Sequence, residues 1–170
     1  MPRCAAYALS FAMLGLVACA STPPSRDPGA LAAAYAAEGR YAEASREIEL
    51  AVRTHPKDRT LQLEAAEIYE RAGNTDKAVS HLEDAIELAP DDAETWVRLA
   101  ELENGRGNTD DAYVAYRRAE RLAPDDVRAV SGLALTADTL GFTDEAQRAY
   151  ARWSELEKGA RVPGEPAPRD

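Results

Sequence analysis

A 34-residue repeat constrains the fold of this chain more than any other feature. Pro90 and Pro124 lie 34 positions apart (124 − 90), and the same pair of aspartates follows each of them. The same interval separates Gly73 from Gly107, and Asn-Thr-Asp follows both glycines. A fixed period of roughly 20–50 residues is typical of proteins in which similar units stack on one another. The sequence therefore predicts a stacked array of repeats.

The period extends over four copies, at approximately residues 25–58, 59–92, 93–126 and 127–160. In each copy, alanines and larger apolar residues recur three or four positions apart, which is the spacing of one face of a helix. Two such stretches occur in each copy, with a glycine between them. A proline closes the first three copies, and the residue before a proline disfavours the helical conformation. We therefore expect two helices in each copy.

Polar residues indicate where these helices begin. Asp27 is placed to cap the first helix of the first copy, and Asp92 and Asp126 are placed to begin the first helices of the third and fourth copies. Thr75 and Thr109 are the expected N-caps of the second helices in the second and third copies. The aspartate that follows each threonine favours the positive end of a helix.

The repeated columns resemble the tetratricopeptide repeat (TPR) family, in which small residues, aromatic residues and a closing proline occupy set places in 34 positions. The resemblance covers about 130 residues and implies an all-α fold, an α-solenoid of stacked antiparallel helix pairs over residues 28–158. Trp96 is the tryptophan that the family pattern expects, whereas Gln62 holds the equivalent position in the second copy. Glu103 and Ala137 stand where the pattern expects an aromatic residue. The alanine columns are Ala32, Ala66, Ala100 and Ala134, and Ala44, Ala78, Ala112 and Ala146.

The fourth copy is expected to be degraded. Trp153 and Lys158 stand where the small residue and the proline should be. Gly132 lies inside the first helix of this copy, where glycine costs about 0.5–1 kcal/mol relative to alanine. Residues 159–170 contain three prolines and few apolar residues, so they are predicted to be a disordered tail.

The N-terminus has the pattern of an export signal. Residues 1–18 contain one basic residue, Arg3, and an apolar stretch too short to span a membrane as a helix of about 20 residues. The stretch ends in Leu16-Val17-Ala18-Cys19, which resembles the lipobox of bacterial lipoproteins and implies acylation of Cys19 after cleavage. Residues 19–27 would then form a short polar tether. The alternatives are an ordinary secretory signal and an N-terminal membrane anchor.

The lipoprotein resemblance also implies a location. Two or more acyl chains hold a protein stably on a membrane, whereas one chain does so only marginally. Ala20, rather than an aspartate, follows the cysteine. By analogy with sorting in Gram-negative bacteria, this favours the outer membrane, with the protein facing the periplasm.

Composition argues against several functional classes. The formal net charge of −10 argues against nucleic acid as a partner, because phosphates demand a basic surface. Both cysteines lie in the first twenty residues, so the repeats cannot hold a disulfide framework. His55 and His81 lack metal-ligand spacing to a cysteine or to each other. The sequence therefore predicts a protein that is not an enzyme and has no catalytic residues, cofactor or metal site.

Binding is the function that remains. In the TPR family, the first helices of successive copies line a groove that accepts a peptide, and this implies an acidic, partly apolar groove in this chain. Such a groove suits a protein or peptide with basic and apolar anchors, although the acidity could equally be a solubilising surface. The groove residues implied by the resemblance are Leu63, Glu67, Glu70, Val97, Arg98, Glu101, Arg128 and Leu135.

The last helix offers a second candidate surface. Tyr150, Trp153 and Leu156 recur at helical spacing, and no further repeat follows to cover them. They could contact a partner or a second copy of the chain, or they could only mark an atypical last repeat. The leading hypothesis is a lipid-anchored adaptor in a bacterial envelope assembly, such as pilus, secretion-channel or cell-wall machinery. The alternative is a secreted or inner-membrane TPR module that forms homo-oligomers through this C-terminal contact face.

Overall fold

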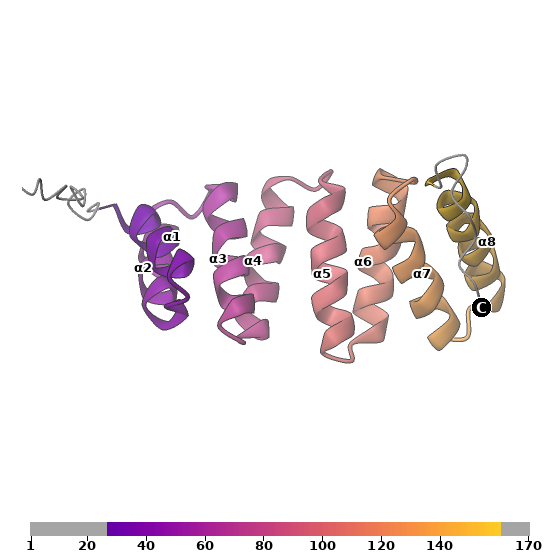
Figure 1. Ribbon diagram of the computed structural model, residues 1–170, viewed down its shortest axis with the longest axis horizontal. Helices are drawn as coiled ribbons and strands as arrows, with labels where there is room; N and C mark the ends of the chain where they lie inside the picture. Colours follow the sequence, from indigo (N-terminus) through magenta and orange to yellow (C-terminus); the bar gives the residue numbers. More distant parts are fainter. Residues whose placement is uncertain (1–26, 161–170) are drawn as a thin grey trace, which may run out of the picture.

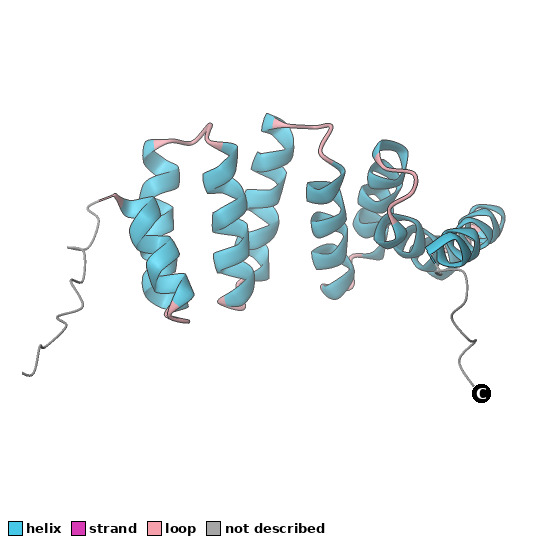
Figure 2. Cartoon of the chain, turned by 45° about the horizontal axis from the view of Figure 1, so that its top comes forward, coloured by secondary structure: helices cyan, strands magenta, loops and turns pink. Residues whose placement is uncertain are grey.

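The computed structural model describes residues 27–160, which form helices joined by short turns and contain no strand within that range. Consecutive helices pair as antiparallel hairpins, and the hairpins follow one another in a single row (Figure 1). Figure 2 shows the same row from a second direction, with short loops at both edges. The helices are α1 (Pro28–Ala37), α2 (Tyr41–Thr54), α3 (Arg59–Arg71), α4 (Thr75–Leu88), α5 (Ala93–Gly105), α6 (Thr109–Leu122), α7 (Val127–Thr139) and α8 (Thr143–Ala160).

The predicted α-solenoid is confirmed, with one hairpin in each copy. Between the helices of each hairpin, a glycine adopts a positive φ of 73–82°, a backbone conformation that side-chain-bearing residues rarely adopt. The predicted caps at Asp27, Asp92 and Asp126 are also confirmed, because each side chain accepts a bond from a backbone N–H of the first helical turn. These bonds satisfy donors that a helix start leaves without an intrahelical partner.

The predicted caps at Thr75 and Thr109 are wrong by one residue. Asn74 is the N-cap of α4, and its side-chain oxygen accepts a bond from Lys77 N at 3.2 Å. Asn108 holds the same position before α6, but its side chain makes no capping bond. Its amide donates to the carboxylate of Glu103 instead, at 2.6 Å.

Glu103 is one departure from the family pattern, and its hydrogen bonds explain why a carboxylate is accepted there. Although it occupies an aromatic position, its side chain is buried and holds Arg106 at 2.8 Å as well as Asn108. Polar bonds therefore hold the α5–α6 turn, whereas in the second copy the equivalent Tyr69 packs in the core. Buried carboxylates are tolerated in proteins when they are paired in this way.

Gln62, which stands in place of a tryptophan, is a second departure from the family pattern. The Trp96 indole N–H donates to the carbonyl of Pro90 at 2.9 Å, which ties α5 to the turn before it. One copy earlier, the Gln62 amide donates to the carbonyl of Pro56 at the same distance. An amide therefore replaces the indole N–H in the second copy, although the apolar bulk of the ring is lost.

Small residues allow the helices to approach closely. The alanine columns are fully or nearly fully buried, and larger residues such as Ile48 and Leu82 fill the space between the hairpins. Among the glycines of the described residues, Gly132 of α7 has the least free space around it, because it lies against the ring of Tyr116 from α6. A β-carbon at Gly132 would lie 2.3 Å from Tyr116 Cε1, so this junction requires a glycine.

The N-terminal predictions lie outside the described residues. These are the signal peptide at 1–18, the acylated Cys19 and most of the tether at 19–27. The predicted tail overlaps the structure at its start, where α8 continues to Ala160, and residues 161–170 are also outside the described range. Among the described helices, none combines the length and the apolar character that crossing a membrane requires.

Candidate functional site

The first helices of the four hairpins present one continuous series of side chains, which we call the first-helix face: the exposed sides of α1, α3, α5 and α7. The α1 backbone approaches α3, and α5 approaches α7. Side chains connect the middle of the face, where Arg98 of α5 pairs with Glu70 of α3 at 3.4 Å. This face contains the residues that the family resemblance implied for a groove.

Most of the predicted groove residues are accessible on this face. Leu63 and Arg98 are half-buried, and Leu63 packs against the core. Val97 is a wrong assignment, because it is fully buried in the core cluster and no partner could contact it. That the accessible residues bind a partner stays a prediction. The exposed members are Glu67, Glu70, Glu101, Arg128 and Leu135, of which Leu135 has 52% of its surface accessible.

The acidity expected of the groove is partly compensated by arginines of the protein itself. Arg71 pairs with Glu67 at 2.9 Å within α3, in addition to the pair between Arg98 and Glu70. The Arg128 guanidinium of α7 binds the carboxylate of Glu94 on α5 through both of its terminal nitrogens. Two of these pairs, Arg98–Glu70 and Arg128–Glu94, join neighbouring hairpins, and the three pairs together compensate three carboxylates of this face.

Three carboxylates on this face have no ion pair in the described part of the chain, Glu64, Glu101 and Asp138. Partial burial raises the pKa of Glu64, and the nearby acids Asp58, Glu67 and Asp27 raise it further. Partial burial also raises the pKa of Glu101, but Arg128 acts against this shift. Every charge that acts on Glu64 therefore raises its pKa, whereas Arg128 and Arg98 partly compensate Glu101.

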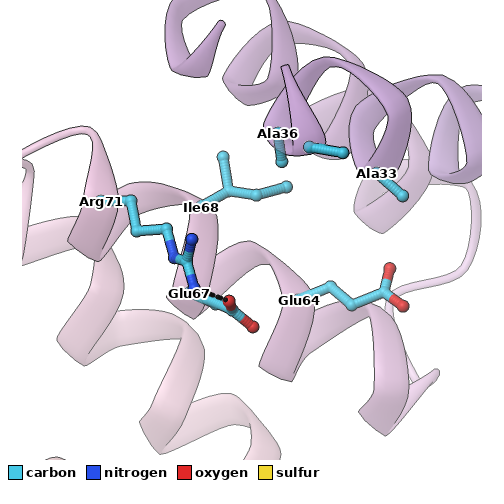
Figure 3. Close-up of a pocket in the computed structure, with 7 residues that line it drawn as sticks. Ala33, Ala36, Glu64, Glu67, Ile68 and Arg71 are labelled. Atoms are coloured by element: carbon cyan, nitrogen blue, oxygen red, sulfur yellow. Dashed lines mark ion pairs between the residues drawn. The ribbon is translucent and has the colours of Figure 1, made fainter. Parts of the chain in front are cut away.

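A hollow of about 270 Å³ lies beside Glu64, between α1 and α3. Three alanines of α1 form one wall, and α3 forms the other (Figure 3). Figure 3 shows Glu64 on the Ala33 side of the hollow, apart from the Glu67–Arg71 pair. The sequence analysis did not predict this apolar wall, although Ala33, Ala36 and Ala37 recur at the spacing of one helix face. The lining residues are Ala33, Ala36, Ala37, Glu64, Glu67, Ile68 and Arg71.

The two histidines have no role in such a site. His55 is exposed in the turn before α3. His81 stacks on Tyr69 with 5.4 Å between ring centroids and bonds to the side-chain oxygen of Gln62 at 2.8 Å, and burial lowers its pKa. Across residues 27–160, no cluster of histidine, cysteine and carboxylate side chains could hold a metal ion.

The C-terminal contact face is less open than predicted. Tyr150, Trp153 and Leu156 are each half-buried. Tyr150 packs against the core and stacks on Trp153, with 6.3 Å between ring centroids. The indole N–H of Trp153 is buried without a hydrogen-bond partner among the described residues. These residues thus cover the end of the solenoid in part, and their role in self-association stays a prediction.

Comparison with known proteins agrees with this architecture. The sequence profile of the tetratricopeptide repeat family matches residues 30–68 and 59–102. No curated protein matches the chain in sequence.

Solved structures of MamA are similar in fold. One superposes with a TM-score of 0.69 at 20% identity, covering 78% of this chain and 77% of that chain. MamA from Desulfovibrio magneticus RS-1 gives 0.68 at 19% identity, covering 80% and 78%. MamA AMB-1 gives 0.72 at 22% identity, covering 79% and 74%. Identity this low shows a shared fold alone. Together with the 34-residue period and the stacked hairpins, the family match over residues 30–102 shows that this chain contains tetratricopeptide repeats.

Proposed function

We propose that this chain is a membrane-anchored adaptor that binds a partner protein through the first-helix face in a bacterial envelope. Stacked helical repeats create extended surfaces for binding other proteins, so the fold suggests an interaction scaffold. The observation that carries the proposal is the first-helix face itself, which combines an apolar-walled hollow, exposed Leu135 and Glu64, a carboxylate without an ion pair in the described part of the chain. These features suit recognition of a polypeptide rather than a reaction.

The anchor is argued from the sequence. The Leu16-Val17-Ala18-Cys19 ending resembles a lipobox, and an acylated Cys19 would place the repeats close to the lipid surface through the tether of residues 19–27. The absence of aspartate after Cys19 favours the outer membrane, facing the periplasm. The repeats would then present the first-helix face to other envelope components, such as pilus, secretion-channel or cell-wall machinery.

Metabolic labelling tests the anchor. Bacteria that express the full chain are grown with an alkyne-bearing fatty acid, and the protein is isolated and coupled to a fluorophore. We expect labelling of the wild type and none of Cys19→Ser. An unlabelled wild type, or equal labelling of both proteins, would end the lipoprotein proposal.

A matched pair of variants tests the binding surface. Leu135 on α7 and Val114 on α6 are both exposed apolar residues, with 52% and 61% of their surface accessible, but only Leu135 belongs to the first-helix face. Each is changed to aspartate in the full chain, and proteins captured from solubilised envelopes are compared. We expect Leu135→Asp to lose a partner that the wild type and Val114→Asp retain. Equal capture by both variants would refute the use of this face.

A further inference from the structure

The size of the hollow between α1 and α3 limits what can occupy it. At about 270 Å³ it is smaller than the roughly 300–1,000 Å³ of sites for drug-sized ligands. One wall consists of the methyl groups of Ala33, Ala36 and Ala37, and Ile68 of α3 lies opposite them. This space suits a single side chain with an aliphatic stem rather than a cofactor.

The charges around the hollow indicate which chemical group the end of that side chain should carry. Glu64 lies in the wall of the hollow, and its carboxylate has no ion pair among residues 27–160. The other carboxylate of the hollow, Glu67, already pairs with Arg71. The acids nearest to Glu64 add to the unfavourable field at its carboxylate, so an incoming cation would relieve it.

The repeat pattern gives Glu64 no structural role in the solenoid. One copy earlier the equivalent residue is Ala30, and in the two later copies it is Arg98 and Gly132. The fold therefore accepts a neutral, a basic or an absent side chain at this position. A half-buried, uncompensated carboxylate that the architecture does not need points to a ligand.

We propose that the α1–α3 hollow receives one lysine or arginine side chain of the partner protein, with Glu64 as its counter-charge. Lysine and arginine bury their methylene stems along apolar surfaces and keep the charged head at the edge. The stem lies along the alanine wall and the head reaches Glu64. This inference rests on the proposed function and names the chemistry of the partner at one point.

The test uses two small probes of similar shape, one positively charged and one neutral. The full chain, labelled at its alanine methyl groups, is titrated with N-acetyl-arginine methylamide and with the citrulline equivalent, a neutral analogue of the same shape. We expect shifts at Ala33, Ala36 and Ala37 with the arginine probe, and binding at least about fivefold weaker with citrulline. Binding of the arginine probe should also weaken as salt is added.

Three variants assign the effect to the hollow. Glu64→Gln should weaken the arginine probe about five- to tenfold, whereas Glu87→Gln removes the same charge from an exposed position on α4 and should leave binding unchanged. Ala33→Leu fills the hollow without changing charge and should also abolish the shifts. Circular dichroism checks that each variant is folded.

The outcomes separate this inference from the proposed function. Equal binding of arginine and citrulline, an unaffected Glu64→Gln variant, or no shift at the three alanines would overturn the inference. If the Leu135→Asp variant still loses its envelope partner in that case, the adaptor proposal stands without the basic anchor.

Discussion

Replacing Gly132 with alanine should destabilise the solenoid, although helix propensity alone predicts the opposite. Alanine in a helix is favoured over glycine by about 0.5–1 kcal/mol. The new methyl group, however, would lie 2.3–2.6 Å from three ring atoms of Tyr116, where ordinary contacts lie at 3.4–4 Å. Tyr116 is only 6% exposed, so its ring cannot move into solvent. Overpacking of this kind costs about 1–3 kcal/mol, which outweighs the gain in propensity.

We expect a net loss of about 1–2 kcal/mol and a Tm lower by about 4–8 °C, measured by urea and thermal unfolding followed by circular dichroism. Gly105→Ala is the matched control. Gly105 also lies in a helix, but an added β-carbon there would meet nothing within 4 Å, so this variant should be neutral or more stable.

The same substitution in a Tyr116→Leu protein tests whether the tyrosine ring causes the loss of stability. Tyr116→Leu places at this position the residue that Leu82 provides one copy earlier, and it removes the ring. Adding Gly132→Ala to Tyr116→Leu should then cost little, and the difference between the two backgrounds measures the coupling. A Gly132→Ala protein as stable as the wild type would refute the argument from close approach.

Two further predictions concern polar groups in the hairpins. Glu103→Ala should lower the free energy of unfolding by about 1–3 kcal/mol, because Arg106 and Asn108 lose a buried acceptor; an unchanged urea midpoint would contradict this. His81 should make stability depend on pH. Burial lowers its folded pKa, so the unfolded chain takes up a proton near pH 6.5 before the folded chain does, and stability falls as the pH drops below about 6.5. His81→Phe keeps a ring to stack on Tyr69 and should reduce that fall between pH 7.5 and 5.5; an identical fall in both proteins would exclude His81 as the cause.

The fold could be predicted from the sequence because the same pattern of residues occurs in each copy. The 34-residue spacing, the alanine columns and the glycine and proline positions occur in several copies, so a substitution in one copy does not hide the pattern. The caps at Asp92 and Asp126 were predictable for the same reason. The caps of the second helices were not, because asparagine and threonine are adjacent in Asn74-Thr75 and both are good capping residues. Only the backbone shows which of them precedes the helix.

The location of the candidate site could be predicted from the sequence, but the ion pairs that compensate its acidic residues could not. The family resemblance located the first-helix face, yet the sequence did not show that Arg98 binds Glu70 or that Arg128 binds Glu94. The partners of these pairs lie 28 and 34 positions apart, and whether their side chains meet depends on how neighbouring hairpins pack. Val97 was misplaced because the family resemblance assigns whole helices to the groove and does not show which of their side chains are buried in the core.

The contact between Tyr116 and Gly132 has a consequence for the order of the copies. Ala30, Glu64 and Arg98 occupy the positions equivalent to Gly132, and each carries a side chain where the tyrosine ring needs empty space. Shuffled chains in which the third copy precedes any copy other than the fourth would bring that ring against one of these side chains. The hairpins of this protein are therefore not interchangeable modules, and chimeras that exchange them must move these two residues together.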